Sequence, residues 1–289
     1  MLTRAQIDEY NEVGAIVLPG VLTQQEVARL RAVTDSFVAQ ARGMTGHDDV
    51  LDLDETHTPD APRVRRIKRP HLRHPEYAAY WRHPGIIAAL TDLWGPNIRS
   101  DTSKLNMKLA GHGAAVEWHQ DWVFYPHTND DLAEVGIMID AATTGNGPML
   151  VVPGSHKGPL FSHHVNGRFC GAMDPHEPGA HYERAVPLTG PAGSITIHHA
   201  RVIHGSGPNR SDTDRRFMLL QFRAADAWPL AWAQPDGAAD IEAFNAMIVA
   251  GEPVMTPRIE KVPLYIPWPR AERQGSIYEN QKAMAARYF

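Results

Sequence analysis

The stretch Glu117-Trp118-His119-Gln120-Asp121-Trp122 (residues 117–122) carries the strongest signal in the chain. Side chains alternate between the two faces of an extended strand, so His119 and Asp121, two positions apart, would lie on one face. A histidine and a carboxylate side by side supply two of the three ligands of the facial triad that binds non-haem Fe(II). The third ligand must then be a histidine that a different strand brings to the same place.

His204 is the candidate for the third ligand. It follows the apolar segment 194–198 and opens the turn His204-Gly205-Ser206-Gly207, which places it just beyond a predicted strand. His198 and His199 lie on the way into that turn and are rivals for the same role. The chain holds 16 histidines, so the choice depends on position in the pattern and not on residue type alone.

An arginine adds a further feature to the predicted site. Arg215 stands eleven residues after His204, at the start of the apolar segment 217–222. A buried guanidinium there can hold a carboxylate through two parallel hydrogen bonds. A triad leaves positions of an octahedral ion open, so a 2-oxo acid could chelate two of them and leave one for oxygen. Arg216 competes with Arg215, because only one of two neighbours on a strand faces inward.

Short apolar segments dominate the chain from about residue 98 onward. Turns such as Gly145-Asn146-Gly147-Pro148 and Pro153-Gly154 separate most of them. This spacing is typical of an antiparallel β sandwich or barrel. The predicted strands are 103–109, 135–139, 149–152, 194–198 and 217–222.

The ends of the chain predict more helix. Thr3 with Gln6, and Thr23 with Glu26, form capping-box patterns that begin two amphipathic helices. We therefore interpret the chain as one domain (1–289) with a mainly helical N-terminal part (1–97), a β core (98–225) and a C-terminal extension (226–289). Further expected elements are a strand at 15–18, a loop at 44–66, and helices at 84–94, near 238–250 and near 277–288.

Three motifs occur in an order and spacing that resemble a known family. They are Trp118-His119-Gln120-Asp121, the stretch from Asn146-Gly147-Pro148 to Pro153-Gly154-Ser155-His156, and His204-Gly205-Ser206-Gly207-Pro208-Asn209 with Arg215 downstream. Together they are similar to the phytanoyl-CoA dioxygenase family, over roughly residues 5–225. Its members are Fe(II)- and 2-oxoglutarate-dependent oxygenases. The resemblance implies a mainly β fold, with a double-stranded β-helix core (jelly-roll, cupin-like) and N-terminal and peripheral helices.

The resemblance also implies roles for individual residues. His119, Asp121 and His204 would bind iron, and Arg215 would pair with the C5 carboxylate of 2-oxoglutarate. The family further implies contacts to 2-oxoglutarate from the strand before the first motif, here Lys104-Leu105-Asn106-Met107-Lys108. Lys104, Asn106 and Lys108 alternate onto one face, and Asn106 is our choice among them.

The activity that the resemblance implies is hydroxylation of a small molecule, with release of succinate and CO2. Its cofactors would be Fe(2+), 2-oxoglutarate and O2, with ascorbate as a supporting reductant. Asp121 is intact, which argues against halogenation, because family halogenases replace this carboxylate with a small residue. The substrate stays open among CoA esters, amino acids, phosphonates and secondary metabolites. Desaturation and epoxidation by the same iron are alternatives, as are a non-catalytic cupin-like binding protein and a metal-dependent isomerase or hydrolase.

Two groups of residues are candidates for contact with the substrate. Trp122, Phe124 and Tyr125 follow the metal motif and are read as a wall of the substrate site, or else as core. A basic cluster is normally a solvated face, but one beside the expected loop is also placed to recognise an anionic substrate group. That cluster is Arg63, Arg65, Arg66, Lys68 and Arg69.

The composition of the chain argues against nucleic acids and membranes as partners. The chain of 289 residues has a formal net charge of −5, so no basic field indicates nucleic acid or an anionic membrane. It contains no apolar run long enough to predict a transmembrane helix, and its N-terminus lacks the pattern of a signal peptide. The single cysteine, Cys170, fits a reducing compartment, so we expect a cytoplasmic protein. The sequence leaves the oligomeric state open.

Overall fold

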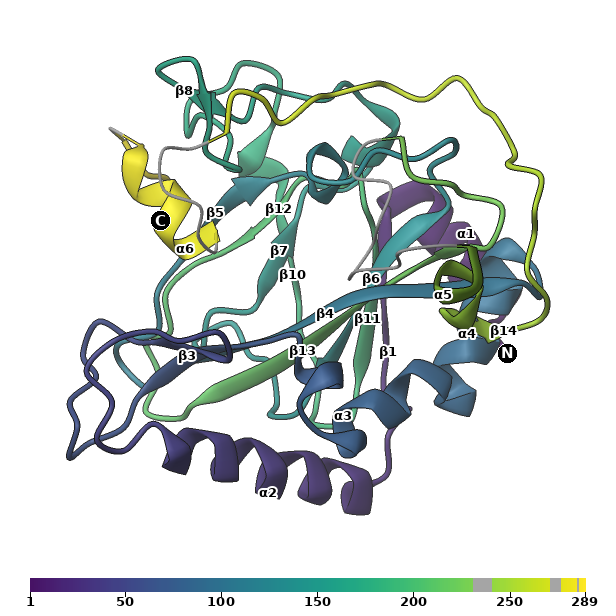
Figure 1. The fold of residues 1–289 in the computed structure, drawn as a ribbon. Coiled ribbons are helices and arrows are strands. Elements are labelled where there is room, and N and C mark those ends of the chain that lie inside the picture. The colour runs from purple at the N-terminus through teal and green to yellow at the C-terminus, as the bar shows by residue number, and fades with distance from the viewer. Residues whose placement is uncertain (231–240, 271–276, 285) are drawn as a thin grey trace.

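The computed structural model describes residues 1–230, 241–270, 277–284 and 286–289. Two antiparallel sheets form its core (Figure 1). The larger sheet has the strand order β1-β11-β6-β13-β4-β3-β2, with β14 also paired to β4, and the smaller sheet has the order β10-β7-β12-β5. The strands of the larger sheet are β1 (Ala15–Leu18), β2 (Leu51–Leu53), β3 (Val64–Lys68), β4 (Ile98–Lys108), β6 (Leu132–Met138), β11 (Ile195–His199), β13 (Arg215–Ala224) and β14 (Ile248–Ala250).

The smaller sheet carries the metal motifs. Its strands are β5 (Val116–His119), β7 (Met149–Val151), β10 (Val186–Leu188) and β12 (His204–Ser206). A separate hairpin is formed by β8 (His164–Val165) and β9 (Arg168–Phe169). The predicted β core with peripheral helices is thus confirmed, although the strands extend beyond some predicted bounds; β4, for example, begins at Ile98 and not at residue 103.

Helices cover the outer face of the larger sheet. They are α1 (Arg4–Val13), α2 (Gln24–Gln40), α3 (Pro75–Ala79) and α4 (Pro84–Trp94), and Figure 1 shows α2 running along the sheet. Both predicted capping boxes are present, at Thr3 and at Thr23. Gly14 ends α1 in the left-handed region, with φ of 83°, which favours glycine because it lacks a Cβ atom.

Strand alternation assigns different chemistry to the two faces of the larger sheet. Ile195 and Ile197 of β11 are fully buried in the same apolar cluster as Leu30 of α2. His198, next along β11, instead lines a cavity that residues of both sheets enclose. The outer face therefore holds the apolar core beneath the helices, and the inner face can carry polar side chains.

The segment 44–66 was expected to be a loop, and this prediction is wrong for part of its length. Strands β2 and the start of β3 lie within it and extend the larger sheet beyond β4. Leu51, Leu53 and Val64 supply the buried apolar residues. A strand of three residues is too short to show a clear alternating pattern, and the charged residues around it obscured the signal.

The expected C-terminal helices are shorter than predicted. Of the predicted helix 238–250, residues 238–240 lie outside the described residues, α5 covers Ile241–Ala246, and β14 follows as a strand paired with β4. Of the predicted helix 277–288, α6 covers Ile277–Asn280 and a 3-10 turn covers Gln281–Ala283. Among the helices of the described residues, none has the length and apolar character needed to cross a membrane.

Candidate metal centre

His119 and His204 are brought together by strand pairing. His119 ends β5 and His204 begins β12, and the two residues are direct partners in the antiparallel register. Directly opposite residues point to the same face of a sheet. Their rings accordingly lie side by side, with centroids 4.0 Å apart.

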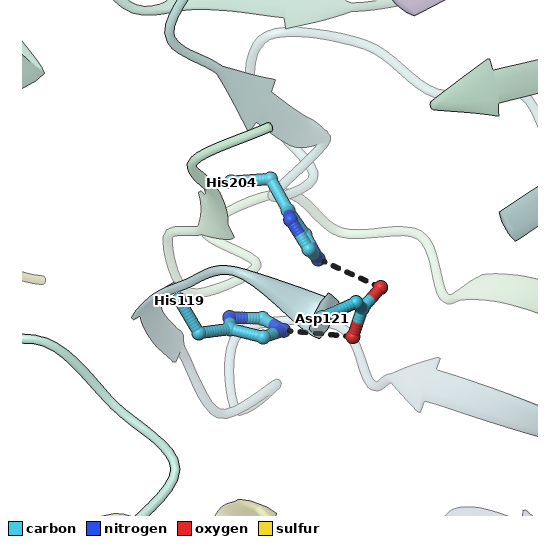
Figure 2. A group of neighbouring side chains, drawn as sticks. All are labelled: His119, Asp121 and His204. Atoms are coloured by element: carbon cyan, nitrogen blue, oxygen red, sulfur yellow. Dashed lines mark ion pairs between the residues drawn. The ribbon is translucent and has the colours of Figure 1, made fainter. Parts of the chain in front are cut away.

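Asp121 completes the group. Its Oδ1 lies 3.8 Å from His119 Nε2, and its Oδ2 lies 3.5 Å from His204 Nε2, as Figure 2 shows. One potential ligand atom from each of the three residues lies within 4.8 Å of the others, and all three side chains are buried. Two imidazoles and one carboxylate, with the remaining positions open, are the donor set of a non-haem Fe(II) site, so the residues fit this ion.

Hydrogen bonds orient both imidazoles for ligation. His119 Nδ1 lies 2.8 Å from the carbonyl oxygen of Glu117, and His204 Nδ1 lies 3.0 Å from that of Val202. A carbonyl only accepts, so each Nδ1 carries the proton and donates it. Each Nε2 is then left with a lone pair for a metal ion.

Electrostatics hold the three groups in their ligating forms. Burial lowers the pKa of His119 to about 4 and that of His204 well below its usual value, which keeps both rings neutral at pH 7. Burial alone would raise the pKa of Asp121, but the charge of Lys104 is the main cause that holds it well below its ordinary value. Lys104 Nζ is 3.8 Å from Asp121 Oδ1.

Gln120 explains why His119 and Asp121 both point inward. Gln120 keeps an extended backbone, and Asp121 then opens a 3-10 turn. The backbone N–H of Gln120 donates to His163 Nε2 at 2.9 Å, and its side-chain amide donates to the carbonyls of Pro159 and Arg201. These contacts anchor Gln120 on the opposite side, so its two neighbours face the cavity.

The cavity beside the triad has a volume of about 270 Å³. Its wall includes residues of both sheets and of α6, so it lies between the layers of the fold. Arg215 and Asn106, expected to contact 2-oxoglutarate, both line it, together with Lys104 and Lys108.

Arg215 fits the anchoring of a carboxylate. It is 4% exposed, and among the described residues its Nε has no hydrogen-bond partner and its guanidinium pairs with no carboxylate. Burial lowers its pKa to about 10, so it stays charged at pH 7. A buried cation without a counter-ion is costly, and a carboxylate ligand would compensate it. The rival Arg216 instead points to the opposite face, where it pairs with Asp140 and Asp35.

Lys108 is a second cation at the same end of the cavity, and the sequence reasoning preferred Asn106 to it. Lys108 is the cross-strand partner of Arg215. Its Nζ donates to the carbonyls of Ser206 and Gly207. Burial and the charge of Arg215 hold its pKa well below the usual value. Asn106, two residues earlier, has an Oδ1 atom without a hydrogen-bond partner in the described part of the chain.

The three aromatic residues expected to form the substrate wall separate in the structure. Phe124 and Tyr125 line the cavity, whereas Trp122 does not. Trp122 is fully buried in a different apolar cluster, and its indole N–H donates to the carbonyl of Pro263. Trp122 lies within the 3-10 turn Asp121–Val123 and packs in the core, whereas Phe124 and Tyr125 follow that turn and reach the cavity.

Glu134 and Tyr278 were not expected at the site from the sequence, and His198 was expected there only as a rival ligand. All three line the cavity. His198 Nε2 lies 3.6 Å from Asp121 Oδ2, although the group of ligand atoms contains His204 in its place. His199 alternates away, toward Asp130. Only the register of β11 with β6, which pairs His198 with Glu134, could have revealed this arrangement.

Comparison with known proteins identifies the family. Residues 10–217 match the family described as phytanoyl-CoA dioxygenase. The chain belongs to the phytanoyl-CoA dioxygenase family. It is 34% identical to a "Probable alpha-ketoglutarate-dependent hypophosphite dioxygenase" of Stutzerimonas stutzeri, across 97% of this chain and 98% of that protein. It is 28% identical to an "L-proline trans-4-hydroxylase" of Streptomyces griseoviridis, across 78% of this chain and 88% of that protein.

Solved structures agree on the fold. The crystal structure of EctD from S. alaskensis with bound Fe superposes with a TM-score of 0.66 at 22% identity, covering 91% of this chain and 88% of that one. The double-stranded β-helix predicted from the sequence is therefore confirmed. The predicted enzyme class and its iron and 2-oxoglutarate cofactors are confirmed as well, by the family, the relatives and the triad together.

Proposed function

We propose that this dioxygenase binds iron through His119, Asp121 and His204 and holds the far carboxylate of 2-oxoglutarate with Arg215. It would use them to hydroxylate a small substrate, releasing succinate and CO2. The observation that carries the proposal is the grouping of three ligand atoms within 4.8 Å in the same cavity as a buried arginine that pairs with no carboxylate of the described residues.

The chain and the cofactors have different roles in the proposed reaction. Iron, when bound, supplies the redox chemistry with O2 and the keto acid. The residues of the chain bind, orient and exclude water. Arg215 and Lys108 fix one end of 2-oxoglutarate, and Phe124 and Tyr125 form part of a wall that limits access to the ligands. Neutral imidazoles that donate from Nδ1 keep the ligating geometry before the metal arrives.

The size of the cavity favours a small substrate. Pockets for drug-sized ligands usually span about 300–1,000 Å³. The cavity here measures about 270 Å³ and must also hold 2-oxoglutarate. Hypophosphite, named for the relative that aligns along 98% of its length, is the first substrate to test. Its hydroxylation would convert a P–H bond to P–OH, with one oxygen atom of O2 going to product and the other to succinate.

The test is a succinate-release assay with protein reconstituted anaerobically with Fe(II). Substrates would be hypophosphite, methylphosphonate, L-proline and ectoine, with oxygen consumption followed in parallel. We expect one substrate to give succinate and oxidised product in equal amounts. A hydroxylated product distinguishes this reaction from desaturation or epoxidation. A protein that binds iron stoichiometrically but releases no succinate from 2-oxoglutarate, with or without these substrates, would support the non-catalytic alternative.

A further inference from the structure

The wall of the cavity carries more positive charge than the two cofactors neutralise. Among the described residues, four cations line it, Arg66, Lys104, Lys108 and Arg215, against the two carboxylates of Asp121 and Glu134. A ferrous ion and dianionic 2-oxoglutarate cancel each other. With iron and 2-oxoglutarate bound, the cavity therefore keeps the excess positive charge of its wall. It stays positive even with Lys108 neutral, as the burial of that amine favours.

The cations form two separate groups along β4. Lys108 pairs in register with Arg215 at the end expected to hold the C5 carboxylate. Lys104 stands four residues earlier on the same strand, which at about 3.4 Å per residue puts the two backbone positions about 14 Å apart. Lys104 Nζ lies within 4 Å of both Asp121 Oδ1 and Glu134 Oε1. Lys104 is thus at the metal end of the cavity.

Iron would change the role of Lys104. Without metal, Lys104 pairs with Asp121 and balances its charge. With a ferrous ion on the carboxylate, the charge of Asp121 is taken up by the metal, and Lys104 keeps only Glu134 as an anionic partner. Lys104 then becomes available to a second anion beside the iron ligands.

Arg66 is the member of the basic cluster that reaches the cavity. It is the cross-strand partner of Asn106, and both line the wall. Its neighbours are already engaged, since Arg65 pairs with Glu279 and Lys68 pairs with Asp52. Arg66 pairs with no carboxylate in the described ranges, and its Nε lacks a hydrogen-bond partner there.

Tyr278 of α6 supplies a neutral donor to the same cavity. Its side chain is 3% exposed and lines the cavity, and its hydroxyl has no hydrogen-bond partner within the described residues. Burial raises its pKa, although Arg215, Arg66 and Lys104 act against this shift, so the phenol stays protonated at pH 7. A buried hydroxyl without a partner is costly, and a ligand oxygen would satisfy it.

We propose that Arg66, Lys104 and Tyr278 form a second anion-binding position, which holds a small oxyanion substrate beside the iron ligands. This inference rests on the proposed function and specifies its substrate class. A phosphorus oxyanion or a small carboxylate offers acceptor oxygens to two cations and one hydroxyl, which are all donors. A neutral substrate would leave the surplus charge buried and uncompensated.

The experiment measures binding and not turnover. The anaerobic complex of the full chain with Fe(II) and 2-oxoglutarate is titrated calorimetrically with hypophosphite, methylphosphonate and acetate. We expect saturable one-to-one binding of at least one of these anions. Tighter binding of the two phosphorus anions would assign a phosphorus oxyanion, and tighter binding of acetate would assign a carboxylate.

Matched variants locate the binding position. Arg66→Gln should weaken the anion at least tenfold, whereas Arg66→Lys, which keeps the charge, should retain most of the affinity. Lys68→Gln removes a positive charge from the same strand outside the cavity and should leave the affinity unchanged. Tyr278→Phe should weaken the anion severalfold.

The outcomes separate the two proposals. Iron stoichiometry and 2-oxoglutarate affinity are measured first, and their loss in the wild-type protein would refute the proposed function. Normal cofactor binding with no saturable binding of any of the three anions would overturn the anion position alone. Equal anion affinity in wild type and Arg66→Gln would overturn it as well.

Discussion

His119 and His204 are direct cross-strand partners, the last residue of β5 opposite the first residue of β12. The metal centre is therefore a property of one strand pairing in the smaller sheet. Asp121 joins it through the turn that follows β5. The three ligand side chains come from different positions on this pair of strands and the turn after β5. Removal of one side chain should therefore abolish tight iron binding without unfolding the protein.

His119→Ala should lose stoichiometric iron. The substitution leaves one histidine and one carboxylate, too few ligands to hold Fe(II) tightly. Metal analysis after anaerobic loading and desalting measures the effect, with circular dichroism to verify the fold. His112→Ala, at an exposed histidine that does not line the cavity, is the control and should keep full iron. Full iron in His119→Ala would contradict the ligand assignment.

Arg215→Ala should weaken 2-oxoglutarate more than iron. A hydrogen bond to a charged group contributes about 1.5–3 kcal/mol, which corresponds to roughly 10- to 150-fold in affinity. Anaerobic titration of the Fe(II) protein with 2-oxoglutarate, followed by the absorption of the complex, measures this. Arg216→Ala is the neighbouring control, because its guanidinium pairs with Asp140 on the other face. Unchanged affinity in Arg215→Ala, or equal losses in both variants, would move the anchor elsewhere.

The metal-free protein should lose stability as the pH falls below about 6.5, the ordinary pKa of histidine. Burial lowers the pKa of His163 to about 3. Its ring donates from Nδ1 to the carbonyl of Phe161 and accepts at Nε2 from the N–H of Gln120, so only the neutral ring satisfies both contacts. Between pH 6.5 and 3 the unfolded chain binds the extra proton. The stabilisation is complete above this window and is lost progressively through it.

Urea unfolding of the metal-free protein at several pH values tests this expectation. Between pH 7 and pH 5 one such histidine contributes a loss of about 2 kcal/mol in the free energy of unfolding. His163→Gln should reduce the dependence on pH by about this amount. A free energy of unfolding that stays constant from pH 7 to pH 5 would contradict the prediction, because it would mean that the His163 ring takes up a proton as readily in the folded protein as in the unfolded chain.

Gly136→Ala should destabilise the fold strongly. Gly136 lies on β6, where an added Cβ atom would meet the ring of Phe217 at 2.0 Å and Thr196 Oγ1 at 2.6 Å. Overpacking of this kind typically costs about 1–3 kcal/mol in the free energy of unfolding. Gly46→Ala, where nothing lies within 4 Å of the added atom, should change stability by less than about 0.5 kcal/mol. Chemical denaturation of both variants compares them, and equal stabilities would contradict the packing.

Local patterns made much of the fold predictable. The structure contains the expected capping boxes at Thr3 and Thr23 and the expected helix Pro84–Trp94. These features were predictable because helix caps and helical spacing depend on residues that are close together in the sequence. Strands β2 and β14 escaped prediction. Each has only three residues, and each is defined by its pairing with a distant strand, which short-range pattern does not reveal.

In the candidate site, too, some residues could be predicted from local sequence and others could not. The motif around His119 and the turn at His204 pointed to residues that the structure brings together. Trp122 was grouped with Phe124 and Tyr125 because all three follow the metal motif closely in the sequence, but its side chain packs in the core and does not line the cavity. Tyr278 gave no signal, because its approach to the cavity depends on how α6 packs against segments far away in the sequence.

The contribution of α6 to the cavity has a consequence for how such enzymes diversify. Tyr278 lies beyond the span 10–217 that matches the family, whereas all three triad residues lie inside it. Part of the cavity wall is therefore encoded in a stretch of chain that is separate from the one that carries the triad. Exchange of the C-terminal segment offers a route by which evolution, or a protein engineer, can alter what the enzyme accepts while leaving its reactive centre untouched.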